Sequence, residues 1–181
     1  SPFTTRRTFE KLIHSEIEAA QAGKTAKITA KMNSLEDKDI IELLYKASQA
    51  GVQIRLIIRG FTCLIPGVKG LSENIYITSI IDRYLEHGRI YMFHNGGDEQ
   101  MYIGSADWMT RNLDRRIEVL VPIYDKNLFT ELKDIFILQL NDNCKARIQD
   151  AEEQNLYVKK LDGEAEIRSQ YAIYDYLKSK N

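Results

Sequence analysis

The stretch TAKITAKMNSLEDKDIIELLYKASQAGVQIRLIIRG, residues 25–60, decides the fold class. Apolar and polar side chains alternate over 25–32, as in a strand with one buried face. Apolar residues then recur at helical spacing over 33–51, between a Ser–Asp start signal and a closing glycine. Residues 52–58 are rich in β-branched side chains and predict a second strand. A strand, a helix and a strand at this spacing form a parallel βαβ unit, which indicates an α/β fold.

The rest of the chain extends this unit. The patterns predict a helix over 5–22, a loop over 63–74, a strand over 75–79, one or two helical turns over 80–87, a hairpin of 89–93 with 100–105, a buried strand over 115–123, and helices over 127–142 and 167–179. A parallel unit followed by a hairpin predicts a mixed sheet of about six or seven strands, flanked by helices. We expect residues 1–181 to form a single domain, with a partly irregular segment from about 143 to 181 that ends in a helix.

Composition limits the class of protein. The chain of 181 residues is 44% hydrophobic and 28% charged, which suits one globular domain. Its net charge is −1, so any anion site must come from the local placement of cations. We find no apolar run of about 18 residues and no secretory signal, and we expect the two cysteines to be reduced thiols of a cytoplasmic protein. The first residue is Ser1 and not Met, so we expect a piece of a longer protein.

Three histidines are candidates for chemistry. His14 lies beside the apolar stripe of the first predicted helix and is expected to be solvated. His94 ends a predicted strand, where a role in the turn or in hydrogen bonding is expected. His87 precedes Gly88 and lies two residues before Arg89, so it is the candidate for a functional histidine.

Arginines form the second signal. Arg59 ends a strand of the βαβ unit, and ligands gather outside the carboxyl ends of such strands. Arg116 lies in the predicted strand 115–123, where a buried arginine needs a carboxylate or a bound anion as its partner. Guanidinium groups grip phosphate in a bidentate manner, which suits phosphoryl transfer. The alternative is a solvated, ion-paired surface, which is common for charged residues. No P-loop, GxGxxG, zinc-ligand or GxSxG pattern appears.

The region after His87 resembles the phospholipase D signature. That signature has a histidine, a lysine two positions on, an aspartate five further on, and a Gly-Ser-x-Asn turn. Here His87 fills the first position, Arg89 replaces the lysine, His94 stands at the aspartate, and Gly-Ser-Ala-Asp occupies the turn at 104–107. The match is therefore partial.

A longer match covers almost the whole chain. The segments SPFTTRRTFEKLI, AKMNSLEDKDIIELLYKASQAGVQIRLIIRG, PGVKGLSENI, RYLEHGRIY, NGGDEQMYIGSADWMTRNLDRRIEV and AIYDYLKS are similar to the C-terminal part of the long-chain polyphosphate kinase family. That resemblance implies a phospholipase-D-like fold and reversible transfer of the terminal phosphate of ATP to inorganic polyphosphate, with Mg²⁺. It implies a phosphohistidine in the preceding domain, with His87 as an assisting catalytic residue and Arg59 and Arg116 as phosphate-binding residues.

The resemblance also carries weaker expectations. Arg89, Ser105 and Lys31 are further candidates at the phosphate site, and no metal ligand is expected in this chain, so Mg²⁺ is expected to bind mainly outside it. The expected partners are ATP, ADP, polyphosphate and the upstream domains of the same chain, without nucleic acid. The full-length protein is expected to be a homo-oligomer in the cytoplasm, with membrane association as an alternative.

Two other functions remain open from the residues alone. The first is a phospholipase-D-type nuclease or phosphodiesterase, which needs a complete motif that this chain lacks. The second is a non-catalytic module that binds polyphosphate. ATP-dependent phosphoryl exchange by the full-length parent would separate a kinase from a nuclease.

Overall fold

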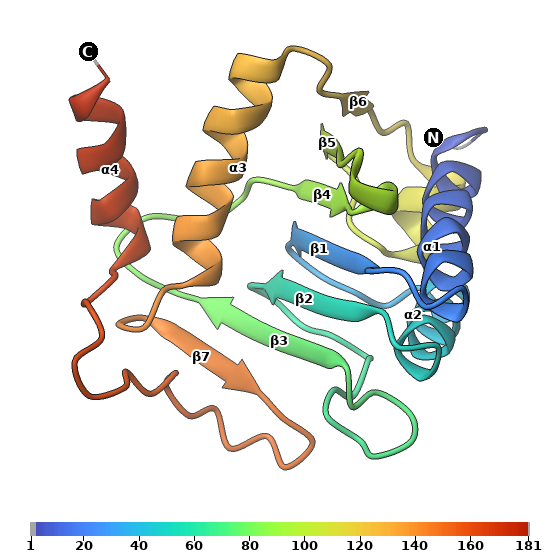
Figure 1. Ribbon diagram of the computed structural model, residues 1–181, viewed down its shortest axis with the longest axis horizontal. Helices are drawn as coiled ribbons and strands as arrows, with labels where there is room; N and C mark the ends of the chain where they lie inside the picture. The colour runs from blue at the N-terminus through green and yellow to red at the C-terminus, as the bar shows by residue number, and fades with distance from the viewer. Residues whose placement is uncertain (1–2, 181) are drawn as a thin grey trace.

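A seven-stranded mixed sheet forms the centre of the computed structural model, which describes residues 3–180 (Figure 1). The strand order is β6-β5-β4-β1-β2-β3-β7, and the number of strands agrees with the sequence prediction. Helices α1 (Thr5–Gln21) and α2 (Lys38–Gln49) pack together on one face. Helix α3 (Lys126–Leu140) covers the other face, and α4 (Ser169–Ser179) packs beside α3. No helix in the described part of the chain is long and apolar enough to cross a membrane.

The predicted βαβ unit is present. Strands β1 (Lys27–Met32) and β2 (Gln53–Ile58) pair in parallel, with α2 between them along the chain. Asp37 caps α2, because its carboxylate accepts a hydrogen bond from the amide of Ile40. Because β1 and β2 are parallel neighbours, both strands end at the same edge of the sheet.

Five further strands complete the sheet. They are β3 (Ile75–Ile80), β4 (Ile90–Phe93), β5 (Gln100–Gly104), β6 (Leu120–Pro122) and β7 (Ala146–Gln149). Strand β3 is parallel to β2, whereas β4 runs antiparallel to β1, and β5 and β6 continue antiparallel on that side. Strand β7 pairs antiparallel with β3 at the opposite edge. The predicted hairpin is thus β4–β5, joined through a short turn at Asn95–Gly97.

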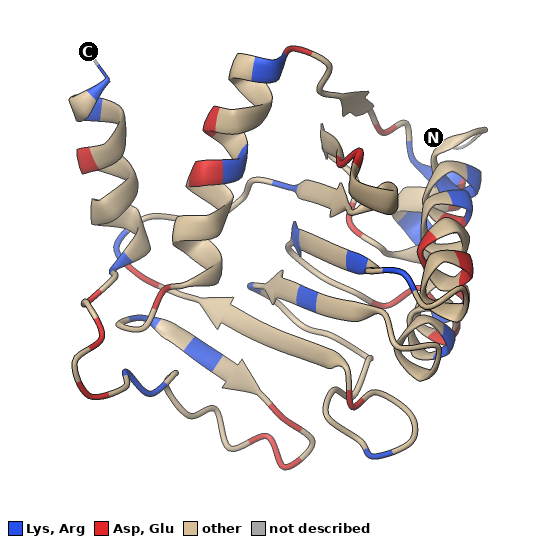
Figure 2. Cartoon of the chain, viewed as in Figure 1, with Lys and Arg blue, Asp and Glu red and all other residues tan. Residues whose placement is uncertain are grey.

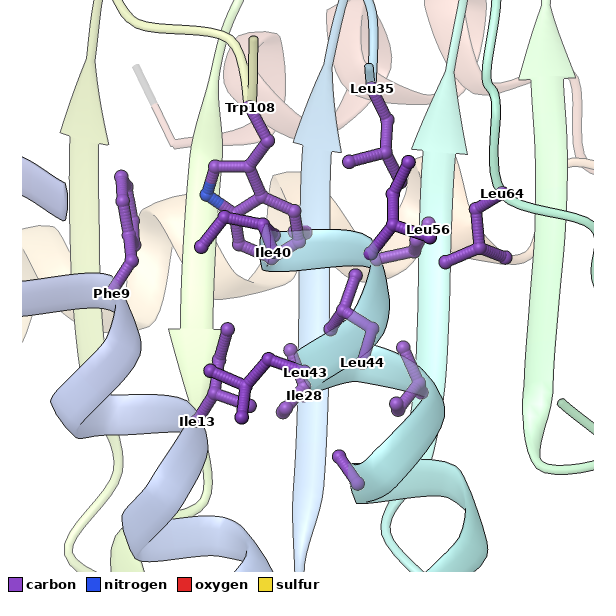
Figure 3. Close-up of a cluster of buried hydrophobic side chains, with 14 of the residues drawn as sticks. Phe9, Ile13, Ile28, Leu35, Ile40, Leu43, Leu44, Leu56, Leu64 and Trp108 are labelled. Atoms are coloured by element: carbon purple, nitrogen blue, oxygen red, sulfur yellow. The ribbon is translucent and has the colours of Figure 1, made fainter. Parts of the chain in front are cut away.

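The main core lies between the sheet and the α1–α2 layer (Figure 3). Its largest side chain is Trp108, which is fully buried and lies against the rings of Phe9 and Tyr91 at centroid distances of 5.5 and 5.3 Å. A second, smaller cluster joins the other face to Phe136 of α3. Fully burying one such side chain stabilises the fold by roughly 1.5–3 kcal/mol, so the two layers hold the sheet rigid.

Two predictions of secondary structure were wrong, and one strand was not predicted. Residues 115–123 are not a buried strand: β6 spans only three residues at the edge of the sheet, and Ile117, which precedes it, is 91% exposed. Residues 82–84 bend without forming a helical turn. The polar segment after 143 contains β7, which its weak alternation did not indicate.

Candidate functional site

The sheet topology brings the predicted site residues to one edge. Strands β1 and β2 end there, β4 starts there because it is antiparallel to β1, and β5 ends there in turn. Arg59 follows β2 directly, and His87 lies three residues before the start of β4. We call this the carboxyl edge. Arg59 and His87 therefore both lie at this edge.

A chain of polar contacts runs along the carboxyl edge. Arg59 Nη2 donates to Oδ1 of Asn33, the residue that follows β1. The backbone N–H of Asn33 donates to Asp107 Oδ1 at 2.8 Å, and the same carboxylate oxygen accepts from Arg89 Nε at 3.1 Å. Arg89 Nη1 donates to the His87 carbonyl at 2.7 Å and lies 3.1 Å from His87 Nδ1. These contacts therefore connect Arg59 to His87 through residues at the ends of β2, β1, β5 and β4.

The Arg89 contact selects a tautomer of His87. A guanidinium group has only donors, so Nδ1 of His87 must accept the hydrogen bond from Arg89. In the neutral imidazole the proton then sits on Nε2. The exposed His87 ring can therefore offer an Nε2–H donor to a ligand.

Arg89 and Asp107 form a buried ion pair. The side chain of Arg89 is 11% exposed and that of Asp107 is 5% exposed. Asp107 neutralises the charge of Arg89, so Arg89 attracts a distant anion only weakly. The main effect of Arg89 is to orient the His87 ring. Asp107 stands at the asparagine position of the partial phospholipase D signature, and its role here is to hold Arg89 and the Asn33 amide.

Arg59 has one donor without a hydrogen-bond partner among the described residues. Its Nη1 atom is buried, and within residues 3–180 it has no hydrogen-bond partner. A buried donor without a partner is costly, and a bound oxyanion would remove that cost. Gly60 lets the chain pass close to β1, since a Cβ atom there would lie 2.8 Å from the Asn33 carbonyl oxygen. This close approach fixes the backbone position from which the Arg59 side chain extends.

Arg116 lies on an exposed segment beside the end of β5. The predicted buried strand is absent there, so the argument that burial demands a partner does not apply, and the Arg116 side chain is exposed. The segment meets β5 where the Ser105 amide donates to the Val119 carbonyl at 3.1 Å. The Ser105 hydroxyl donates to Glu118, so Ser105 is already engaged.

Lys31 is buried, contrary to the expected polar face of β1. Its side chain is 5% exposed, and its ammonium group donates to Glu86 and, at 3.0 Å, to Gln139. Burial lowers the pKa of Lys31, although the Glu86 carboxylate opposes that shift. Lys31 is therefore a buried, ion-paired lysine.

Sequence reasoning missed Asn33 and Glu86. Asn33 had a usable signal, since it follows a parallel strand directly at the edge where ligands gather. Glu86 had no such signal in the sequence, because its partners Lys31 and Gln139 lie far away along the chain. Trp108 is a packing residue, as expected.

The carboxyl edge is an open surface. A hollow of about 550 Å³ lies between β5 and the start of α3, and none of the predicted site residues lines it. His87 and Arg116 are both exposed. Figure 2 shows basic and acidic residues interspersed over the chain, so this edge does not belong to a single-sign surface. Ligand sites are usually concave, so this chain alone provides one wall of a site.

The carboxylates of the edge are poor metal ligands. Within the described ranges, no three His, Cys, Asp or Glu side chains gather in a group that could hold a metal ion. Asp107 already accepts from Arg89 and Asn33, and Glu118 accepts from Ser105 and Asn112. Since Mg²⁺ requires free oxygen ligands, these residues do not suit it by themselves.

Comparisons with known proteins agree with this fold. Residues 1–170 match the family described as "Polyphosphate kinase C-terminal domain 2". The chain is 52% identical over 179 residues to the polyphosphate kinase of Vibrio vulnificus and 49% identical over 175 residues to that of Halalkalibacterium halodurans. These matches cover 99% and 97% of this chain, and the chain spans about a quarter of the length of these relatives.

Solved structures give the same answer. The crystal structure of the polyphosphate kinase from Porphyromonas gingivalis superposes with a TM-score of 0.96 at 47% identity, over 99% of this chain and 28% of that one. A phospholipase D family member, Nuc from Salmonella typhimurium, shares the fold with a TM-score of 0.53 at 17% identity, over 75% of this chain and 89% of that one. The predicted phospholipase-D-like fold is therefore confirmed, and the chain belongs to the polyphosphate kinase family as its second C-terminal domain.

Proposed function

We propose that this chain is the C-terminal catalytic domain of an ATP:polyphosphate phosphotransferase. The full-length enzyme reversibly moves the terminal phosphate of ATP to inorganic polyphosphate through a phosphohistidine in the preceding domain. Family membership supports the reaction class. The observation that carries the site is the meeting of His87 and Arg59, with its unpartnered donor, at one open edge of the sheet.

His87 is the assisting residue in this proposal. Its Nε2–H, set by the Arg89 contact, donates to an oxygen of the transferring phosphate or exchanges a proton with it. Arg59 binds and neutralises that phosphate through its unpartnered Nη1, and the exposed Arg116 approaches from the neighbouring segment. Positioning and neutralising the phosphoryl group is most of what phosphoryl transfer requires of a protein.

Arg89, Ser105 and Lys31 have supporting roles. Arg89 aims the His87 ring, because its own charge is balanced by Asp107. Ser105 fixes the segment that carries Arg116 through its bond to Glu118. Lys31 holds Glu86, the residue before His87, from beneath the edge.

The remaining ligands and partners follow the same proposal. ATP and ADP bind where the upstream domains of the same chain complete the open edge. Mg²⁺, which neutralises and orients the phosphates of the nucleotide when bound, is held mainly by residues outside this chain, since the edge lacks free oxygen ligands. The full-length enzyme is a cytoplasmic homo-oligomer that binds polyphosphate and not nucleic acid, and association with a membrane surface is the alternative location.

Arginine variants of the full-length protein test the site. Arg59→Ala or Arg116→Ala should lower ATP-driven polyphosphate synthesis at least about 10²-fold, comparable to the loss of one donor from a preorganised site. Arg55→Ala is the matched control, since Arg55 lies on β2, the strand that Arg59 follows, and donates to the Leu140 carbonyl of α3 instead. Near-normal turnover in both site variants would reduce these arginines to surface charges and overturn the proposed site.

A further inference from the structure

The segment that carries His87 is not held by hydrophobic packing. Residues 81–89 connect β3 to β4 and form neither helix nor strand. Its apolar side chains point to solvent: Ile81 is 67% exposed, Tyr84 62% and Leu85 76%. Polar contacts must therefore fix where His87 sits.

Gln170 of α4 holds the backbone of this segment. Its Oε1 accepts from the Tyr84 amide at 3.0 Å, and its Nε2 donates to the Tyr84 carbonyl at 2.9 Å. The same Nε2 donates to Glu86 Oε1 at 2.8 Å. One side-chain amide thus replaces the neighbouring strand that this segment lacks. Figure 1 shows the connection from β3 to β4 passing the start of α4.

Arg168 fixes the beginning of the same segment. It makes two hydrogen bonds to the Asp82 carboxylate, of 2.5 Å from Nη2 and 2.8 Å from Nε. The Asp82 side chain is 4% exposed and that of Arg168 is 36% exposed, so the carboxylate end of this bidentate pair is the shielded end.

Glu86 ties the end of the segment to the sheet and to α3. Its Oε2 accepts from the buried Lys31 of β1 and, at 3.1 Å, from Gln139 of α3. Glu86 is the residue immediately before His87, so this bond lies one residue from the imidazole.

The start of α4 is itself anchored. Asp142 Oδ2 accepts from the Ser169 amide at 2.8 Å and from its hydroxyl at 2.7 Å, and Ser169 is fully buried. Asp142 also accepts from the amides of Lys145 and Ala146, which lead into β7. Residues 168–170 are therefore a fixed support and not a fraying helix end.

We propose that Arg168 and Gln170 are positioning residues for His87, holding residues 82–86 so that the imidazole is presented beside Arg89 at the carboxyl edge. Within residues 3–180 neither side chain bonds to His87, Arg59 or Arg116, so both act through the segment. This inference rests on the proposed role of His87 in phosphoryl transfer.

The kinetic test uses the full-length protein. Gln170→Ala and Arg168→Ala should each lower kcat for polyphosphate synthesis by about 10-fold with the KM for ATP little changed, since small misplacements of a catalytic group are costly. In the His87→Ala background neither change should lower kcat further, because the group being positioned is gone. Gln170→Glu serves as a second variant, since it keeps the size of the side chain but loses both donated bonds. Lys178→Ala, an exposed residue later on α4, is the matched control.

Hydrogen exchange makes the test independent of activity. Amides in 82–89 should exchange at least about 10-fold faster in the Gln170→Ala and Arg168→Ala proteins, and unchanged in Lys178→Ala. Unchanged exchange in both the Gln170→Ala and the Arg168→Ala proteins would overturn the proposal that these side chains hold residues 82–86. Faster exchange with normal kcat, or a full further loss of kcat in the His87→Ala background, would overturn the positioning role. If His87→Ala alone leaves turnover intact, the proposed function fails instead. The exchange data alone then decide whether Arg168 and Gln170 hold residues 82–86.

Discussion

Asp107→Ala should be among the most destabilising substitutions at the carboxyl edge. Asp107 is buried and accepts from three donors: the Asn33 amide at 2.8 Å, and Arg89 Nε and Nη2 at 3.1 and 3.4 Å. Alanine removes both acceptor oxygens, and with them all three hydrogen bonds. It leaves a guanidinium group that is 11% exposed without its counter-charge.

The magnitude follows from breaking a buried pair on one side. Such a change costs about 3–5 kcal/mol, and Arg89 keeps one bond to the His87 carbonyl, so we expect about 3–4 kcal/mol. At about 2–4 °C per kcal/mol for a chain of this size, Tm should fall by roughly 6–16 °C. Asp107→Asn keeps one acceptor oxygen, for the Asn33 amide and Arg89 Nε, but loses the charge and the weaker bond at 3.4 Å, so about 1–2 kcal/mol is expected.

Urea unfolding of the 181-residue chain measures this difference. Trp108 is the single tryptophan, it is fully buried, and it follows Asp107 directly, so its fluorescence reports on the site. The midpoint should fall with an unchanged m-value. Arg89→Met with Asp107→Leu should recover most of the loss, because no buried charge remains. A loss below about 1 kcal/mol for Asp107→Ala, or no recovery in the double variant, would refute the assignment of a buried ion pair.

Three further outcomes are expected. The 181-residue chain alone should fold and bind phosphate or sulfate weakly, yet make no polyphosphate from ATP, because water screens the charges of an open edge; synthesis by the purified chain would contradict this. With γ-labelled ATP, the full-length enzyme should carry acid-labile phosphate in its upstream domain, and label on His87 would make that residue the carrier. Burial alone would raise the pKa of Asp142, but hydrogen bonds from the Lys145 amide and Ser169 outweigh it and hold the pKa below its ordinary value. Its stabilising effect should therefore be full above about pH 4 and fade as the pH falls through the lower folded-state pKa. Urea unfolding at neutral and acid pH should show the deficit of Asp142→Asn shrinking in acid, whereas an equal deficit at both pH values would refute the linkage.

The sequence predicted the part of the fold that depends on local periodicity. Alternation over 25–32 and the apolar stripe of α2 predicted the βαβ unit, and the Asn-Gly-Gly turn predicted the β4–β5 hairpin. The rule that parallel strands end at one edge then placed Arg59 correctly. The long motifs supplied the family, which composition and spacing alone did not identify.

The rest depends on contacts between distant residues. An apolar pattern cannot show whether a strand has a neighbour on each side, so Ile117 was expected in a buried strand and lies exposed beside the edge strand β6. Gln170 and Tyr84 are 86 positions apart, and a glutamine in a helix gives no sign that it will bind a backbone so far away. The short β7 forms because β3 offers it an open edge.

The most direct test of the account is ATP-driven polyphosphate synthesis by the full-length His87→Ala enzyme. A positioned acid or base contributes about 10²–10⁴ in rate, and the exposed His87 side chain contributes little to packing. The account therefore predicts a loss of turnover of about that size, with a circular dichroism spectrum and a Tm close to those of the unaltered enzyme. Turnover within about twofold of the unaltered enzyme, well below the factor that a positioned acid or base supplies, would contradict the claim that His87 assists phosphoryl transfer.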